Sequence, residues 1–338
     1  MWSSPQLSTD IGIDVHKYRH KHDCRDTVPR ARLKKMAVIR AMIPPAFEAF
    51  ITPARARPEF WRLLLGLALV VLVYIAWFAG MMLILLLLGG VSGVEYWIQQ
   101  IARAETPTSA LLLLSTFVGL GLGPFLAARI LHDRPSLTVL GPMRNLLRHF
   151  AIATLICAAI FGLSALIPAD YVAAPNLSSS MWLMYLPLAL VGVLVQTGAE
   201  EILFRGYIQQ QLAARFSSPL VWMMVPTVLF ALAHYDPQNA GPNTWYVVAA
   251  TGLFGLAAAD LTARTGSLGA AWGFHFANNV FAILIISLDG PLSGLALYST
   301  PFGATDTDVL RPLIVRDMAV TALTWAAIRY AVTRGHPI

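Results

Sequence analysis

Long apolar stretches decide which folds are open to this chain. The run from Leu63 to Leu88 contains no charged side chain, and a helix needs about 20 mainly apolar residues to cross the hydrocarbon core of a bilayer. Over the 338 residues, 57% are hydrophobic and only 12% are charged, against roughly 25% charged residues in a soluble domain. The sequence therefore predicts an all-α, polytopic integral membrane protein.

The apolar stretches predict about eight transmembrane helices. We expect them near residues 63–88, 109–131, 150–167, 181–215, 219–234, 245–264, 267–288 and 312–332. Arginines flank alternate ends of these segments, and the positive-inside rule then places both termini in the cytoplasm. We expect the bilayer to be a bacterial inner or plasma membrane. The net charge of +6 does not indicate a nucleic-acid partner, because half of the basic residues precede the first apolar stretch.

The polar N-terminus is predicted to differ from the rest of the chain. Residues 1–60 are expected to form a cytoplasmic, partly disordered region, and residues 61–335 a membrane domain with its catalytic core at about 181–288. All four lysines lie between Lys17 and Lys35. This abrupt change suggests the hypothesis that Met36 is the true start and that residues 1–35 extend the gene model.

Within the fourth predicted helix, three charged residues follow the apolar run Met181 to Val195, in the order Glu200, Glu201 and Arg205. Ionisable residues inside a membrane are costly unless they are paired or solvated, so they are functional candidates. Glu201 and Arg205 are four residues apart on a predicted helix and can form an ion pair. Glu200 points about 100° away from Glu201 and has no such neighbour. The pattern predicts one structural glutamate and one that is available for chemistry, although a purely structural ion cluster is the alternative.

Other polar side chains interrupt the later apolar stretches. His234 ends the fifth predicted helix, and the fourth and fifth helices meet at a turn near residues 216–218. Glu200 and His234 both lie roughly 24 Å from that turn at 1.5 Å per residue, so they can face each other. His275 and Asn279 share one face of the seventh helix. Hydrogen bonding that only holds helices together is the alternative role for this pair.

These segments resemble the CPBP family of intramembrane proteases, the type II CAAX prenyl endopeptidase and bacteriocin-processing family. The family pattern is Glu-Glu-x-x-x-Arg, then Phe-x-x-x-His, then His-x-x-x-Asn or Asp. It is matched here by Glu200, Glu201, Arg205, Phe230, His234, His275 and Asn279. Each motif alone is weak, but three in order on separate predicted membrane helices form a strong signal. The resemblance gives supporting roles to Glu201, Arg205 and Phe230.

The resemblance implies an endopeptidase that cleaves a membrane-associated protein or peptide. Glu200 would activate the attacking water, His234 would assist it, and His275 and Asn279 would bind the developing oxyanion. This interpretation needs no cofactor. The alternative is a zinc protease with Glu200, His234 and His275 as metal ligands, although the helical His-Glu-x-x-His motif is absent.

Two non-proteolytic interpretations use the same residues. A membrane immunity or scaffold protein would keep the polar cluster and act by binding. A proton-coupled transporter would use Glu200, but transporters commonly contain repeated halves and this sequence shows no internal repeat. Asp260 and Arg264, four residues apart, predict a local ion pair at the cytoplasmic boundary.

Overall fold

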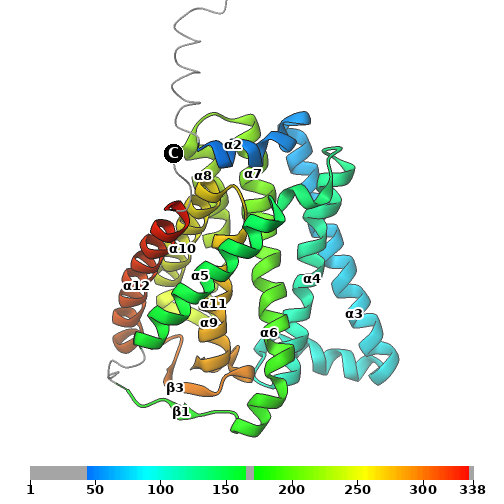
Figure 1. Ribbon diagram of the computed structural model, residues 1–338. Coiled ribbons are helices and arrows are strands. Elements are labelled where there is room, and N and C mark those ends of the chain that lie inside the picture. The colour runs from blue at the N-terminus through cyan, green and yellow to red at the C-terminus, as the bar shows by residue number, and fades with distance from the viewer. Residues whose placement is uncertain (1–43, 165–170, 335–338) are drawn as a thin grey trace, which may run out of the picture. The chain divides into compact units, whose positions relative to one another are not determined.

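The computed structural model describes residues 44–164 and 171–334 and is predominantly helical (Figure 1). The prediction of an all-α membrane protein is confirmed. The hypotheses about residues 1–35 lie outside the described residues. Within the described part, five helices are long and apolar enough to cross a membrane.

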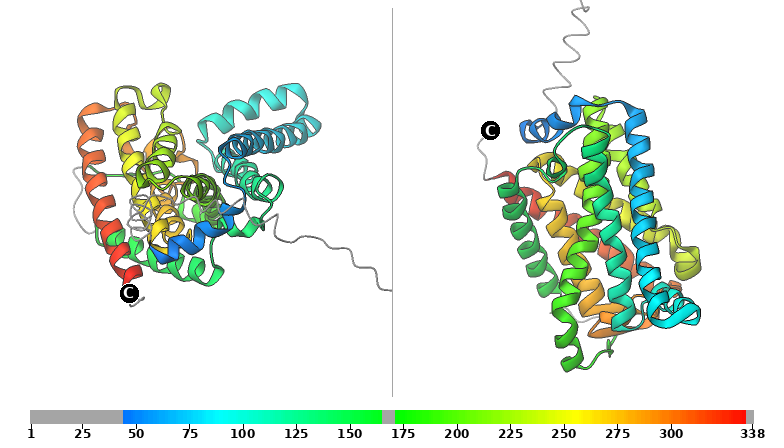
Figure 2. Two further views of the ribbon diagram at one scale, coloured as in Figure 1. Left: turned by 90° about the horizontal axis from the view of Figure 1, so that it is seen from above. Right: turned by 90° about the vertical axis from the view of Figure 1, so that its right-hand side faces the viewer.

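Each predicted crossing has a helical counterpart. The main helices are α3 (Phe60–Arg103), α4 (Pro107–Ile130), α5 (Met143–Ser164), α6 (Ser179–Glu201), α8 (Pro219–Leu232), α10 (Thr244–Thr265), α11 (Gly269–Val280) and α12 (Thr307–Thr333). Among these, α8 and the segment that begins with α11 are apolar but shorter than the spanning helices. Helix α12 is long enough but is not among the five apolar spans, so the number of eight crossings stays a prediction. Seen from above, α3 and α12 lie at opposite edges of the helical bundle (Figure 2).

Helix α3 continues well beyond the predicted end at Leu88. A kink interrupts it at Gly90, whose φ of 67° lies in the left-handed region that glycine adopts without steric cost. The chain then stays helical to Arg103. The sequence prediction placed a loop here because charged residues such as Glu95 reappear after the apolar run.

The fourth predicted helix is continuous to Arg215, as expected, but it changes its winding directly after the two glutamates. Residues Ile202–Gln209 form a π-helical segment, η4, which leads into α7 (Gln210–Arg215). Helix α11 likewise passes into a π-helical segment, η6 (Phe281–Ile285). Segments of this kind occur frequently at functional sites, and here both follow a helix that carries one of the polar motifs.

A small sheet joins the connections that follow α5 and α11, and residues 286–288, which were predicted as the end of a helix, belong to it. Its strands are β1 (Ala174–Pro175), β2 (Ile286–Asp289) and β3 (Tyr298–Gly303), in the order β1-β3-β2. Strand β1 is antiparallel to β3, whereas β2 is parallel to it. The sheet lies at the lower end of the bundle in Figure 1. These strands were not predicted, because they are short and the pairing joins distant parts of the sequence.

Short helical segments complete the connections. They are α2 (Pro45–Ile51), η2 (Thr52–Ala56), η3 (Ser136–Val139), α9 (Pro237–Ala240), η5 (Gly241–Asn243) and η7 (Ser293–Leu295). Helix α2 belongs to the hydrophobic core, since Phe47 and Ile51 are fully buried. The Phe50 carbonyl accepts a hydrogen bond of 2.6 Å from Gln210 of α7.

A buried polar network holds α7 and η4 to the connection between α4 and α5. His132 Nε2 lies 2.8 Å from the Tyr207 hydroxyl, and its ring also contacts the amide of Gln211. Arg134 donates to Gln210 Oε1 at 2.6 Å. Burial lowers the pKa of the Arg134 guanidinium to about 10. The network anchors the end of the π-helical segment that lies farther from the two glutamates.

Candidate active site

Glu201 is the last residue of α6 and is completely buried. Its Oε1 atom accepts a hydrogen bond of 3.0 Å from Arg205 Nη1, which is the ion pair expected from the four-residue spacing. The same oxygen lies 2.9 Å from His275 Nδ1. Because a carboxylate oxygen can only accept, Nδ1 is the protonated nitrogen in this contact. The negative charge of Glu201 is therefore stabilised by Arg205 on one side and by His275 on the other.

Arg205 is held by three different groups. Besides Glu201, its Nη2 atom donates to the Gly255 carbonyl of α10 at 3.2 Å. Its guanidinium also lies over the ring of Phe230, 4.5 Å from the centroid. A buried charge needs such partners, since desolvation alone would strongly destabilise it. These contacts lock η4 to α8 and α10.

Glu200 has a different environment from its neighbour. Its side chain is 11% exposed, and Oε2 lies 3.5 Å from His275 Nε2. That oxygen is buried and has no hydrogen-bond partner within the described residues. The imidazole of His275 thus lies between the two carboxylates. Oε2 of Glu201 is likewise buried without a hydrogen-bond partner within the described residues, but Glu201 is paired through Oε1 and Glu200 is not. The availability of Glu200 for chemistry stays a prediction.

The charges of this cluster indicate one additional proton. Two carboxylates face one guanidinium, so electrical neutrality in a buried site requires one more positive charge or one neutral carboxyl. His275 Nδ1 already carries a hydrogen for Glu201. The extra proton therefore lies either on His275 Nε2 or on Glu200. An ionised Glu200 then accompanies an imidazolium at His275.

Asn279 lies one helical turn after His275 and is oriented by two neighbours. Its Nδ2 atom donates to Gln196 Oε1 at 2.9 Å, and its Oδ1 accepts from Asn278 Nδ2 at 3.1 Å. Gln196 was not identified from the sequence. A signal was present, because it is a polar residue on an apolar helix and lies four residues before Glu200, on the same face.

His234 lies in the turn after α8 and is partly exposed. Its Nδ1 donates to the Phe230 carbonyl at 2.9 Å, because a carbonyl can only accept. In the neutral imidazole, Nε2 then carries the lone pair. Within the described residues, no hydrogen bond or ion pair joins His234 to Glu200.

Phe230 connects the two histidines. Its ring centroid lies 4.8 Å from that of His234 and 5.9 Å from that of His275. Phe254 of α10 also packs on His275, at 4.9 Å between centroids. Phe254 was missed, since one aromatic residue on an apolar helix gives no separate signal. The structure thus brings the glutamates, Arg205 and His275 into direct contact and places His234 across the ring of Phe230.

The zinc alternative needs Glu200, His234 and His275 to gather around one point. Among the described residues, no group of three or more His, Cys, Asp or Glu side chains is arranged to hold a metal ion. Both nitrogens of His275 face carboxylates instead. The residues as they lie do not fit a zinc ligand set, and the zinc hypothesis stays a sequence-based prediction.

Comparisons with known proteins agree with the motifs. Residues 178–281 match the type II CAAX prenyl endopeptidase Rce1-like family, which confirms the family resemblance over this segment. The chain is also 29% identical over 171 residues to a Bacillus subtilis protein described as uncharacterized protein YyaK. That match covers 49% of this chain and 57% of the relative. No solved structure matches.

Proposed function

We propose that this integral membrane protein is an intramembrane endopeptidase that cleaves a membrane-associated protein or peptide. The family match supports a protease of the CAAX type, and the site supplies the groups that peptide hydrolysis needs. The proposal includes a location in a bacterial inner or plasma membrane with both termini in the cytoplasm. Nucleic acid has no part in it.

The observation that carries this proposal is the unequal treatment of two adjacent glutamates. Oε1 of Glu201 is paired with Arg205 and His275, whereas Glu200 has no hydrogen bond within the described residues and meets only His275 Nε2, at 3.5 Å. Oε2 of each glutamate is buried without a hydrogen-bond partner there, so the difference lies in Oε1. A structural ion cluster would pair both carboxylates, because an unsatisfied buried acceptor costs about 1–3 kcal/mol. Such a cost is typical of a site that is completed by a substrate or by water.

The proposed reaction begins with Glu200 ionised and His275 doubly protonated. Glu200 accepts a proton from a water molecule while the water oxygen bonds to the carbonyl carbon of the scissile peptide. The lone pair at His234 Nε2 helps to orient that water. The carbonyl oxygen becomes an oxyanion, and His275 Nε2–H and the remaining Nδ2–H of Asn279 donate to it.

Collapse of the tetrahedral intermediate completes the reaction. The carbonyl re-forms, the C–N bond breaks, and the proton held by Glu200 moves to the departing amine nitrogen. The products are a carboxylic acid and an amine, and Glu200 returns to its ionised state. Arg205 takes no direct part, because it contacts Glu201 rather than the reacting atoms. Its role is to keep Glu201 ionised as the acceptor for His275 Nδ1–H.

Cleavage of a reporter peptide library in proteoliposomes tests this function. We expect activity in the wild type, its loss in Glu200→Gln, and a strong decrease in His234→Ala. Glu95→Gln is the matched control, because this glutamate is exposed on the far part of α3. Retention of activity with a chelator would support the metal-free mechanism. Loss with the chelator and recovery with zinc would instead support the zinc alternative.

A binding role makes the opposite prediction for the conservative variant. Glutamine keeps the shape of Glu200 and most of its hydrogen-bonding capacity but cannot accept the proton. An immunity or scaffold protein would therefore keep its phenotype in Glu200→Gln and lose it in Glu200→Ala. Wild-type cleavage that persists in Glu200→Gln would refute the assigned base.

A further inference from the structure

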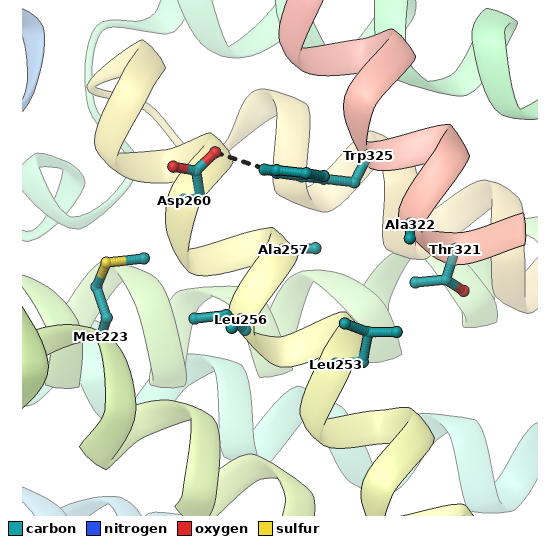
Figure 3. Close-up of a pocket in the computed structure, with 8 residues that line it drawn as sticks. All are labelled: Met223, Leu253, Leu256, Ala257, Asp260, Thr321, Ala322 and Trp325. Carbon is teal, nitrogen blue, oxygen red and sulfur yellow. Dashed lines mark hydrogen bonds between the residues drawn. The ribbon is translucent and has the colours of Figure 1, made fainter. Parts of the chain in front are cut away.

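A second feature of the bundle lies outside the candidate active site. A cavity of about 270 Å³ lies between α8, α10 and α12, and its walls include Met223, Leu253, Leu256, Ala322 and Trp325 (Figure 3). These five residues are only partly buried, so the cavity is open to the surroundings of the bundle. In a membrane-embedded chain, those surroundings include lipid hydrocarbon.

The cavity and the active site use different faces of α10. Phe254 and Gly255 contact His275 and Arg205 in the active site. Leu253 and Leu256, their direct neighbours in the sequence, line the cavity instead. The hydrolytic mechanism therefore leaves the cavity without a role.

One end of the cavity carries charge. Asp260 accepts a hydrogen bond of 3.1 Å from Trp325 Nε1, a contact drawn in Figure 3. Arg264 lies 3.3 Å and Arg329 3.7 Å from the same carboxylate. The contact between Asp260 and Arg264 is the local ion pair that the four-residue spacing predicted. The arginine side chains are 40% and 35% exposed, so both guanidinium groups remain accessible.

The balance of these charges favours an anion. Two guanidinium groups from different helices converge on one carboxylate, which leaves one positive charge in excess. Each guanidinium has five N–H donors, and arginine forms paired hydrogen bonds with phosphate. Basic pockets between membrane helices bind anionic lipid headgroups by such contacts.

We propose that this cavity binds an anionic phospholipid. One acyl chain lies along the apolar walls between α10 and α12, and the phosphate lies on Arg264 and Arg329. A protein helix fits less well, because a transmembrane helix is about 10–12 Å across with its side chains, which is too wide for a cavity of about 270 Å³. The lipid would stabilise the packing of α10 against α12, on the face of α10 that does not contact the active site.

Quenching of tryptophan fluorescence by brominated lipids tests the proposal. The protein is reconstituted in phosphatidylcholine vesicles that contain either brominated phosphatidylglycerol or brominated phosphatidylcholine. Each measurement is repeated in Trp325→Phe, and the difference isolates the signal of Trp325 in the cavity wall. We expect stronger quenching of this component by the anionic lipid, because each arginine near the surface contributes about fivefold in affinity.

Paired variants separate the cavity from its surroundings. Ala322→Phe fills the cavity and should abolish the preferential quenching, whereas Leu323→Phe alters the 68% exposed neighbour and should preserve it. Removal of both Arg264 and Arg329 should abolish the headgroup preference, whereas Arg334→Gln at the end of α12 should not. Equal quenching by the two lipids in the wild type, or no effect of Ala322→Phe in a protein of unchanged melting temperature, would overturn the proposal.

Discussion

The ion pair between Glu201 and Arg205 permits a direct test of how the site is held together. The two side chains are 0% and 1% exposed. In Arg205→Met, the apolar volume is largely kept while the charge is removed. Glu201 then stays buried with His275 as its remaining hydrogen-bond partner. Removal of one partner from a buried ion pair typically destabilises a protein by about 3–5 kcal/mol.

The environment of Arg205 supports the upper part of that range. The substitution also removes the hydrogen bond to the Gly255 carbonyl, which contributes about 1 kcal/mol. It removes the contact with the Phe230 ring as well. A loss of this size should lower the melting temperature in detergent by roughly 5–15 °C. Unfolding in mixed micelles, followed by tryptophan fluorescence, measures the free energy directly.

A double variant distinguishes the lost pair from general damage to packing. In Glu201→Gln/Arg205→Met no charge is left without its partner, so much of the lost stability should return. The matched control is Arg264→Met, which breaks another pair of the same spacing. Because Arg264 is 40% exposed, that change should cost less than about 1 kcal/mol. If Arg205→Met is as mild as the control, or if the double variant is no more stable than Arg205→Met, the interpretation is wrong.

Three further predictions concern other parts of the chain. Gln196→Leu removes the acceptor that orients Asn279. We expect kcat to fall roughly tenfold, the equivalent of about 1.4 kcal/mol, with little change in KM, and an unchanged kcat would exclude this positioning role. Burial, with a smaller effect from nearby arginines, lowers the pKa of His132. The unfolded chain therefore binds a proton first as the pH falls below about 6.5, and the free energy of unfolding should decrease on acidification. His132→Asn should weaken that pH dependence, as measured by urea titrations at several pH values. A Cβ at Gly273 would lie 2.3 Å from a backbone oxygen of α5, so Gly273→Ala should destabilise the protein by about 1–3 kcal/mol; Gly162→Ala, with no atom within 4 Å, is the control for melting temperature.

The membrane class and the motif helices could be predicted from the sequence, because both depend on local patterns. Long apolar runs have few alternatives to membrane helices. Within one helix, the backbone fixes which residues share a face, so the pairing of Glu201 with Arg205 followed from their spacing. The same argument placed His275 and Asn279 together on α11. The local pattern also singled out Glu200 as the less compensated glutamate.

Contacts between helices were decided by the tertiary structure, since they depend on how each helix is rotated and how deeply it lies. Equal distances from a turn allowed Glu200 and His234 to face each other, yet α8 ends at Leu232 and His234 lies across the ring of Phe230. The position of His275 between both glutamates could not be derived from spacing. The sequence also could not predict the hydrogen bond between Gln196 and Asn279. The same is true of the sheet that joins residues 174–175 to 298–303. The sequence by itself thus indicated most of the polar groups that interrupt the apolar helices, although not Gln196, and only the packing of α6, α8, α10 and α11 decided which of them touch.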